Sequence, residues 1–131
     1  MQGVSIQRVA DSLGLKNFTP CVDLEARFIE LPDINRPALQ MAGFFEHFEQ
    51  ERVQIIGTVE YTYLNHMPEE HRHEHYRQFL SYNIPCVVFC RDFQPEEEFL
   101  KLASANGIPV LGTSDATSSF TAELIYKLTK E

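Results

Sequence analysis

The chain has 131 residues, 44% of them hydrophobic, which is enough for about one domain with an ordinary apolar core that needs neither metal nor disulfide. Its 19 acidic and 11 basic residues give a net charge of −8, which argues against nucleic acid or an anionic membrane surface as a partner. No apolar run approaches the ~20 residues of a membrane span, and the N-terminus lacks the apolar core of a signal peptide, so we expect a cytoplasmic protein.

The first predicted elements are a helix and a short strand. Ser5 is a favoured helix cap and Gly14 a favoured helix end, and the residues between them place their apolar side chains on one face. That face consists of Ile6, Val9, Ala10 and Leu13. A short strand is expected over residues 28–31, ahead of Pro32.

Two sequence blocks come next, from Arg36 to Phe44 (RPALQMAGF) and from Arg52 to Glu60 (RVQIIGTVE). The first predicts a short helix, because proline suits the first helical position and Gly43 suits the point where a helix stops. The second predicts a buried strand that ends at Gly57. Glu60 then falls at the start of another helix, near residues 60–66, where a carboxylate suits the positive end of the helix dipole.

Strands and helices alternate from residue 53 to the end of the chain. The run from Cys86 to Cys90 is continuously apolar, which is typical of a strand covered on both faces. The other predicted elements are a charged helix from Pro68 to about Tyr82, a helix from Pro95 to Gly107, a strand over 109–111 and a helix over 116–130. This order favours a parallel sheet with right-handed crossovers, and therefore a three-layer α/β fold with helices on both faces.

The two blocks closely resemble the N-terminal domain of bacterial HPr kinase/phosphorylase. In that family an Arg-Pro-Gly/Ala-Leu…Ala-Gly-Phe/Tyr segment precedes an Arg-Val/Ile-Gln-Val/Ile-Leu/Ile-Gly-Thr/Lys-x-Glu segment. The resemblance also includes Pro85 before an apolar strand and the Thr-Ser-Ser-Phe run at 117–120, and it spans essentially the whole chain. It implies a fold similar to the N-terminal domains of Mur peptide ligases.

The family's kinase chemistry depends on a second, C-terminal domain with a Gly-x-x-x-x-Gly-Lys-Ser/Thr phosphate loop. None of the six glycines here is followed by Lys-Ser or Lys-Thr, so this chain lacks the backbone cradle and the lysine that such a loop needs. We therefore interpret residues 1–131 as a single non-catalytic domain of a larger enzyme, with no cofactor of its own.

By resemblance, the whole enzyme uses Mg-ATP or pyrophosphate to phosphorylate a regulatory serine of the phosphocarrier HPr, and removes that phosphate by phosphorolysis. It thereby acts in carbon catabolite repression, and it assembles as a homohexamer. The implied partners of this chain are its own C-terminal kinase domain, other subunits and, through the parent enzyme, HPr. The alternative is a free-standing regulatory module of the same fold that binds a ligand or a protein.

A histidine-rich stretch, residues 67–75, is the first candidate for chemistry. His71 and His75 are four residues apart on a predicted helix, so both rings could reach one metal ion, with Glu70 or Glu74 adding a carboxylate. The spacing is equally typical of a solvated helix face with charge pairs one turn apart. We favour the second interpretation and predict no metal site.

The three cysteines cannot all pair, and we interpret them as reduced, structural thiols. Cys86 and Cys90 share one face of a strand but lie about 13 Å apart along it, which is too far for a disulfide. Burial there is expected to raise the thiol pKa, which disfavours a nucleophile. Cys21 lies in a predicted loop with no histidine next to it in sequence.

The segment 113–119 joins the last strand to the last helix, where open α/β sheets usually bind ligands and free N–H groups favour anions. Its candidate residues are Ser114, Thr117 and Ser118. The alternative interpretation is a helix cap supplied by Ser114 or Asp115.

Arg36 and Glu60 are the remaining candidates, together with Gly57 between them. This charged pair belongs either to a buried salt bridge or to the rim of a ligand cleft, and we favour the structural role. The six residues proposed as ligand or interdomain contacts are therefore Arg36, Gly57, Glu60, Ser114, Thr117 and Ser118.

Overall fold

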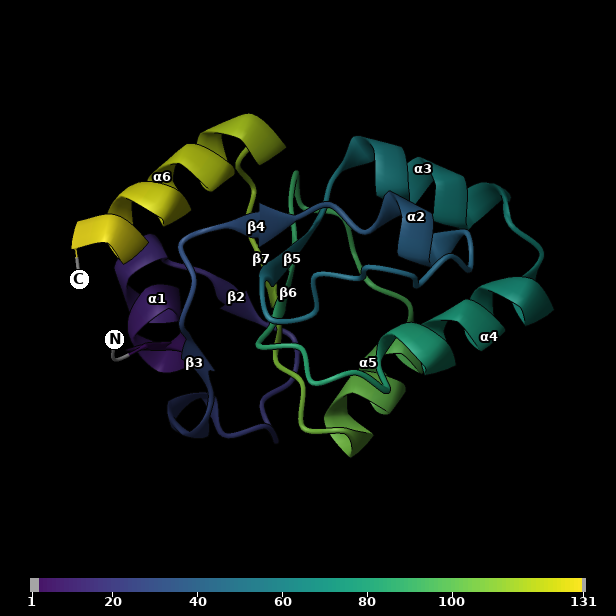
Figure 1. Ribbon diagram of the computed structural model, residues 1–131, viewed down its shortest axis with the longest axis horizontal. Helices are drawn as coiled ribbons and strands as arrows, with labels where there is room; N and C mark the ends of the chain where they lie inside the picture. The colour runs from purple at the N-terminus through teal and green to yellow at the C-terminus, as the bar shows by residue number, and fades with distance from the viewer. Residues whose placement is uncertain (1–2, 131) are drawn as a thin grey trace.

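A five-stranded mixed sheet runs through the middle of the computed structural model, which describes residues 3–130 (Figure 1). From one edge to the other its strands are β2 (Lys16–Asn17), β7 (Val110–Gly112), β6 (Val87–Phe89), β5 (Val53–Ile56) and β4 (Ile34–Asn35). The strands β4, β5, β6 and β7 run parallel, and β2 pairs antiparallel with β7. No helix within residues 3–130 has the length and apolar character needed to cross a membrane.

Helices cover both faces of this sheet (Figure 1). One layer contains α2 (Ala38–Met41), α3 (Thr58–His66), α4 (Glu69–Phe79) and α5 (Glu97–Ala105). The other contains α1 (Ile6–Leu13), α6 (Thr117–Lys130), the 3-10 turn η1 (Leu24–Ala26) and a two-stranded ribbon of β1 (Val4–Ser5) and β3 (Phe28–Ile29). Because β4 to β7 follow one another both in sequence and across the sheet, right-handed crossovers place α2 to α5 on one face.

Side chains alternate between the two faces along each central strand. Ile55, Val88 and Leu111 lie in register on β5, β6 and β7 and pack into the core formed with α1 and α6. Their neighbours Ile56 and Phe89 pack into the second core, formed with α3, α4 and α5. Two cores therefore favour apolar residues on both faces of these strands, with Gln54 of β5 as the buried polar exception, and this is the physical reason for the apolar runs in the sequence.

The predicted three-layer α/β architecture is confirmed, and so are the ends of the first helix. The Ser5 hydroxyl accepts a hydrogen bond from the Arg8 N–H at 3.1 Å, and Gly14 adopts a left-handed conformation with φ of 63°. Several boundaries shift by a few residues: the charged helix ends at Phe79 instead of about Tyr82, and the first predicted strand shortens to Phe28–Ile29. The strands β1, β2 and β4 were not predicted, because each has two residues, which are too few to show an alternation of apolar and polar side chains.

A polar cluster fastens the charged helix α4 to the start of α5. Glu96, just before α5, accepts hydrogen bonds from Arg72 (2.9 Å from Nη2 to Oε2) and from the Tyr76 hydroxyl (2.7 Å), and His73 Nε2 lies 3.5 Å from its second oxygen. Burial by itself raises the pKa of Glu96, but these hydrogen bonds outweigh it and hold that pKa below its ordinary value. The cluster supplements the thin apolar face of α4, on which Tyr76 and Phe79 are buried.

We expect Glu96→Gln to lower the free energy of unfolding by about 1–2 kcal/mol near pH 7, because charge-assisted hydrogen bonds contribute about 1.5–3 kcal/mol and water partly screens these. The folded-state pKa of Glu96 lies below the ordinary value of 4.5, so this stabilisation is present above that pH and is lost as the pH falls through the folded-state pKa. Urea unfolding near pH 7 and at about pH 3 measures the change. Glu123→Gln, at an exposed position of α6, is the matched control. An undiminished effect of Glu96→Gln at the lower pH would contradict the assignment.

Candidate functional site

Four of the six predicted site residues meet where the parallel strands end. Arg36 directly follows β4, Gly57 follows β5, Glu60 lies in the first turn of α3, and Thr117 begins α6. Parallel strands end at the same edge of a sheet, and this edge is where open α/β proteins usually place their sites. The structure therefore brings together residues that are up to 81 positions apart in sequence, Arg36 and Thr117.

The Glu60 carboxylate lies at the centre of this cluster. Its side chain is 2% exposed, and its Oε1 atom accepts hydrogen bonds from Arg36 Nε at 3.2 Å, Arg36 Nη2 at 2.8 Å and the Gly57 N–H at 2.7 Å. Glu60 is the third residue of α3, so it also lies near the positive end of the helix dipole. A buried charge is tolerated here because a guanidinium, a backbone N–H and a helix end all favour it.

Gly57 is required by space, and its conformation is not the reason. Its φ of −111° suits any residue, but a Cβ atom at this position would lie 2.4 Å from Thr117 Oγ1 and 2.7 Å from Arg36 Nη2. Both distances are below any normal contact. The absence of a side chain therefore allows the Arg36 guanidinium and the start of α6 to pack directly against the end of β5.

Thr117 contributes a buried hydroxyl to the same contact. Within residues 3–130 its Oγ1 atom has no hydrogen-bond partner of normal geometry. The neighbouring polar group is the Cys90 thiol at the end of β6: burial raises the pKa of Cys90, and the Thr117 hydroxyl partly opposes this shift. This arrangement keeps Cys90 protonated and buried, which is the opposite of what a nucleophile needs.

Ser114 and Ser118 do not join the cluster. Both are exposed, and neither side chain makes a hydrogen bond within the described part of the chain. The expected helix cap by Ser114 or Asp115 is wrong: the side chain that orders this turn is Thr113, whose hydroxyl accepts from the Asp115 N–H at 3.2 Å. Threonine can make the same local bond to the backbone as serine, and it lies closer to the end of β7.

A polar hollow of about 290 Å³ opens beside this turn, bounded by the 112–115 segment, Lys16 and Asp92. Asp92 and its neighbour Arg91 both have left-handed backbone conformations, with φ of 58° and 57°. Their N–H groups donate to the Thr113 and Asp115 carbonyls at 2.9 Å, so the ends of β6 and β7 are joined by backbone bonds. The N–H groups of Arg91 and Asp92, which lie beside the hollow, are therefore bonded to carbonyls and not available to an anion.

Three buried or half-buried side-chain amides lie next to the cluster, and they were not predicted from the sequence. Asn35 Nδ2 donates to Gln54 Oε1 at 2.7 Å and lies 3.3 Å from Gln40 Oε1. Gln54, which is fully buried, donates in turn to the Glu49 and Arg52 carbonyls at 3.0 and 2.8 Å. These bonds connect β4, β5, α2 and the 42–52 loop. The polar residues that interrupt the two apolar blocks were the available signal.

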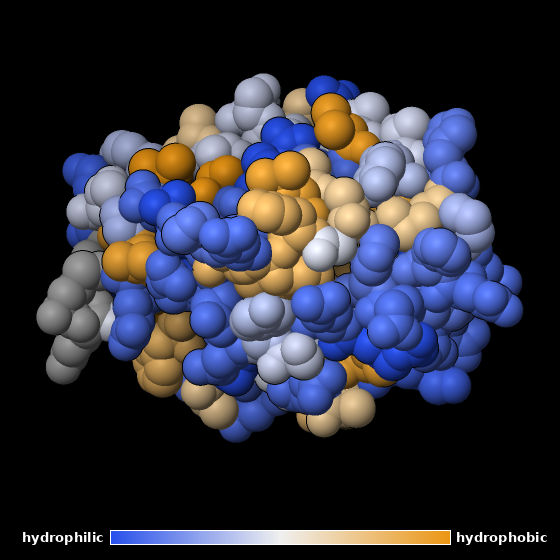
Figure 2. All heavy atoms as spheres, turned by 45° about the vertical axis from the view of Figure 1, so that its right-hand side comes forward, coloured by the Kyte–Doolittle hydropathy of each residue, from blue (hydrophilic) through white to orange (hydrophobic). Residues whose placement is uncertain are grey.

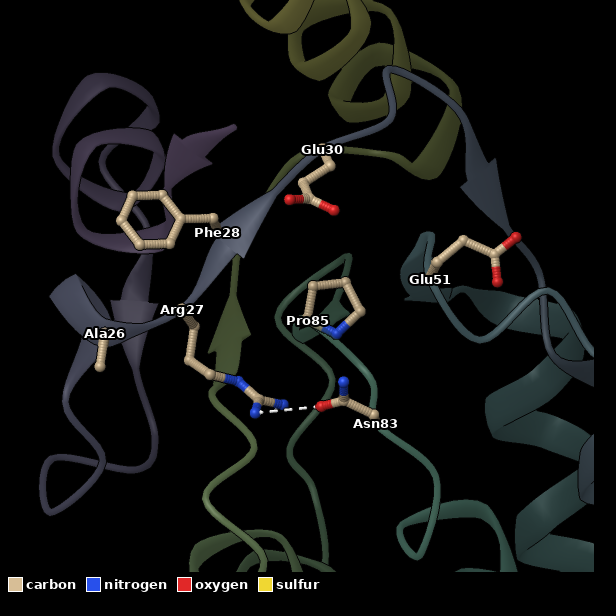
Figure 3. Close-up of a pocket in the computed structure, with 7 residues that line it drawn as sticks. All are labelled: Ala26, Arg27, Phe28, Glu30, Glu51, Asn83 and Pro85. Atoms are coloured by element: carbon tan, nitrogen blue, oxygen red, sulfur yellow. Dashed lines mark hydrogen bonds between the residues drawn. The ribbon is translucent and has the colours of Figure 1, made fainter. Parts of the chain in front are cut away.

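A second hollow, also about 290 Å³, lies at the opposite edge of the sheet, where β5 and β6 begin (Figure 3). Arg27 extends toward Asn83 and donates to its side-chain oxygen at 3.3 Å and to the Ile84 carbonyl. The carboxylates of Glu30 and Glu51 lie across the hollow from it (Figure 3). Arg27 joins the β3 segment to the start of β6, so its hydrogen bonds explain the position of the ribbon on the sheet.

The histidines and cysteines form no reactive constellation among the described residues. His75 Nδ1 lies 2.7 Å from the Met41 carbonyl and so packs α4 against α2, whereas His71 is exposed on another part of the helix. No group of three or more potential metal ligands occurs within residues 3–130. Burial raises the pKa of the Cys86 thiol to about 12, as expected for a fully buried residue just before β6.

The cluster around Glu60 is therefore a structural junction whose carboxylate is buried and whose Arg36 guanidinium is partly exposed. Every hydrogen bond to Glu60 comes from within the cluster, and the Arg36 side chain remains 38% exposed. The arrangement has no nucleophile with an adjacent base and no room for a reacting group. It can fix the relative positions of β4, β5, α3 and α6, and it presents one edge of a guanidinium to a partner.

We expect Arg36→Ala and Glu60→Ala each to lower the free energy of unfolding by about 1–3 kcal/mol, because either change leaves a buried polar group without its partner. The double variant should cost less than the sum of the two, as coupled residues do. Urea unfolding of all four proteins measures the coupling. Arg77→Ala is the matched control, since its bond to Glu74 at 2.6 Å is exposed and should contribute less than about 1 kcal/mol. Small and additive effects would show that the Arg36–Glu60 pair is not a structural junction.

We also expect Gly57→Ala to destabilise the chain by about 1–3 kcal/mol through crowding alone. Thr117→Ala, which removes the nearest clashing atom, should have little effect by itself and should restore part of the stability lost in Gly57→Ala. Thermal unfolding of the two single variants and the double variant tests this. Wild-type stability of Gly57→Ala would mean that the contact with α6 is looser than the structure shows.

Comparison with known proteins agrees with the resemblance seen in the two blocks. The family model described as HPr Serine kinase N terminus matches residues 4–128. The HPr kinase/phosphorylase of Lachnoclostridium phytofermentans is 40% identical over 131 residues, which is all of this chain and 42% of the relative. That of Caldicellulosiruptor bescii is 38% identical over 127 residues, 97% of this chain and 41% of the relative. The chain thus spans about two fifths of the length of these relatives.

A solved structure shares the fold. The crystal structure of the CBS and DRTGG domains of the regulatory region of Clostridium perfringens pyrophosphatase, complexed with the activator diadenosine tetraphosphate, aligns with a TM-score of 0.61. The alignment covers 93% of this chain and 46% of that one at 17% identity, so it supports the architecture alone. Since the family model covers nearly the whole chain and the relatives are 40% and 38% identical, this chain belongs to the HPr serine kinase N-terminal family.

Proposed function

We propose that this chain is the non-catalytic N-terminal domain of a cytoplasmic HPr kinase/phosphorylase, with a structural and regulatory role. The observation that carries the proposal is the family match over residues 4–128, combined with relatives whose length is more than twice that of this chain. The parent enzyme would phosphorylate and dephosphorylate a regulatory serine of HPr with Mg-ATP or pyrophosphate. Its phosphate-binding loop would lie in a C-terminal kinase domain that this sequence does not contain.

The geometry of the chain supports a non-catalytic role for this domain beside a separate kinase domain. At the carboxyl edge of the sheet, where an α/β enzyme would place its catalytic groups, the Arg36–Glu60 pair and the backbone bonds between the ends of β6 and β7 occupy the polar groups without forming a catalytic arrangement. These contacts join the ends of neighbouring strands, which suits a domain with a structural role. Its partners would be the kinase domain of the same subunit and neighbouring subunits of a hexamer.

The exposed edge of Arg36 is the best candidate for an interdomain contact among the predicted site residues. It is a charged group held in place by a buried carboxylate, so its position costs little to maintain when a partner binds. Ser114 remains a candidate because it is exposed and lines the polar hollow, and Ser118 because it is exposed in the first turn of α6. A contact at either place would link ligand or subunit binding to the end of β7.

The proposal is tested with three proteins: this chain alone, the full parent enzyme, and the parent enzyme carrying Arg36→Lys. We expect this chain alone to show no heat of binding with Mg-ATP and no phosphoryl transfer to HPr, and the parent enzyme to show both. Arg36→Lys keeps the charge but loses the paired N–H geometry, so it should alter the regulation of the parent more than its basal rate. Isothermal titration calorimetry and a phosphoryl-transfer assay provide the two readouts.

A dissociation constant for Mg-ATP in the low micromolar range, about −8 kcal/mol of binding free energy, would overturn the assignment of this chain as non-catalytic. If the reading frame encodes no kinase domain after Glu131, the alternative applies: a free-standing regulatory module of the same fold that binds a ligand or a protein.

A further inference from the structure

The polar hollow beside the β7 turn lies where the chain leaves the sheet in two opposite directions. The strand β6 leads to α5, which packs into the core shared with α3 and α4, whereas β7 leads to α6, which packs into the core shared with α1. Figure 1 shows α5 and α6 on opposite sides of the sheet. The loops 90–96 and 113–116 therefore diverge as they leave two neighbouring parallel strands. A crevice of this kind, outside the carboxyl ends of the strands, is the usual ligand site of an open α/β sheet.

Both loops and the edge strand β2 contribute walls to the polar hollow. Residues 92–94 come from the loop after β6, and residues 112–115 come from the end of β7 and the loop after it. Lys16 of β2 closes a third side, because it pairs with Gly112 in the register of β2 and β7. A Cβ atom on Gly112 would lie 2.5 Å from Phe18 Cε2, so the absence of a side chain there makes room for the Phe18 ring. The Lys16 ammonium lies 4.9 Å from the centre of that ring, which places a positive charge at the same wall.

Charged side chains of both signs line the polar hollow without pairing with one another. They are Lys16, Asp92 and Asp115. Within residues 3–130 neither of the two carboxylates accepts a hydrogen bond, and the Lys16 ammonium forms no ion pair. The hydroxyl groups of Thr113 and Ser114 add uncharged donors to the same walls. The hollow therefore offers two negative groups and one positive group to a ligand.

The backbone holds Asp92 in place at the hollow. Arg91 and Asp92 are consecutive left-handed residues, with φ of 57° and 58°. This conformation is disfavoured for residues that carry a side chain, and such strained positions cluster at ligand sites. Their N–H groups bond to the Asp115 and Thr113 carbonyls, and Gln94 Nε2 donates to the Asp92 carbonyl at 3.0 Å. The Asp92 carboxylate thus belongs to a loop that is ordered before any ligand binds, which reduces the entropic cost of binding.

We infer that the polar hollow binds a free basic α-amino acid, such as L-lysine or L-arginine. Such a ligand carries two positive groups and one negative group, which is the complement of the two carboxylates and one ammonium of the hollow. Its carboxylate would bind Lys16, its two cationic groups Asp92 and Asp115, and its methylene groups would pack against the Phe18 ring. The volume of about 290 Å³ lies at the lower end for small-molecule sites and suits a ligand of this size. This inference rests on the residues of the hollow and does not depend on the proposed function.

Other classes of ligand fit the hollow less well. A phosphate would meet two carboxylates and one ammonium, and the N–H groups of Arg91 and Asp92 are bonded to carbonyls. A divalent cation needs a larger set of ligands, and no group of three or more potential metal ligands occurs within residues 3–130. A neutral polyol would bond to the hydroxyl groups but would leave the three charges without complementary charges.

The acidic surface of the chain also attracts cations elsewhere, so the test needs a control away from the hollow. Figure 2 shows hydrophilic side chains over the lower right of its view, where α4 lies. Glu70 of α4 is exposed and makes no hydrogen bond or ion pair among the described residues. Glu70→Gln therefore removes the same charge as Asp92→Asn at a place that the ligand does not contact.

The test is NMR of the ¹⁵N-labelled chain, titrated with L-lysine at about 0.15 M salt. We expect saturable amide shifts in residues 92–94 and 112–115, with a dissociation constant of roughly 0.1–1 mM. L-norleucine, which lacks the side-chain ammonium, should bind about threefold to tenfold more weakly, and L-glutamate more weakly still because its extra charge is negative. Glycerol should cause no saturable shifts.

Two variants assign the charges. Asp92→Asn should weaken the binding of L-lysine and of L-lysinamide by about threefold or more, whereas Glu70→Gln should leave both unchanged. Lys16→Gln should weaken the binding of L-lysine but not of L-lysinamide, because L-lysinamide has no carboxylate. General attraction to an acidic surface has the opposite consequence for Lys16→Gln, since the loss of a positive charge would strengthen the binding of both cations.

Unchanged amide shifts outside the hollow show that each variant is folded, and the ligand series on the wild-type chain tests the inference without any variant. The absence of saturable shifts up to about 10 mM L-lysine overturns the inference, and so does an equal response to L-glutamate or glycerol. An affinity for L-lysine that Asp92→Asn leaves unchanged, or that Lys16→Gln strengthens, overturns it as well, because either result places the contact on other surface charges.

Discussion

The buried negative charge of Glu60 is the constraint on which the structure depends at the edge of the sheet where the parallel strands end. A carboxylate with a side chain exposure of 2% is unstable in a protein interior unless positive charge and hydrogen-bond donors surround it. Arg36 and the Gly57 N–H supply them, and both come from the ends of neighbouring strands. The ion pair thus adds to the strand pairing that places β4 beside β5, and it fixes the start of α3 against the end of β5.

The same junction determines what the edge of the sheet can do. In a parallel α/β sheet this edge is normally where ligands bind, because loops and helix N-termini leave donors unused there. Here the donors are used internally: the Gly57 N–H by Glu60, and the N–H groups of Arg91 and Asp92 by carbonyls of the β7 turn. These donors are thus engaged within the domain, which suits a domain that acts through contacts with other parts of an enzyme.

The same junction also orients the adjoining helices. Because Arg36 bonds to Glu60, the start of α2 is held beside the start of α3. The ion pair therefore links two helices as well as two strands, and the second core packs beneath both of them.

The order and type of the main elements could be predicted from the sequence, from the Ser5 cap and Gly14 end of the first helix to the apolar runs of β5 and β6. These features depend on residues that are close together in sequence, so local physical rules are enough to predict them. The sequence also identified Arg36, Gly57 and Glu60 as a group, through the spacing of two motifs. Their resemblance to a known family carried more information than their chemistry.

Contacts between residues that are far apart in sequence could not be predicted and are visible only in the folded structure. The two-residue strands β2 and β4 exist because longer strands beside them offer hydrogen bonds, and no pattern within two residues can reveal that. Likewise Thr117 meets Gly57, and Asn35 meets Gln54, only when the strands are side by side. Pairing in the folded chain, and not local preference, fixed which polar residues became buried partners and which apolar ones remained exposed.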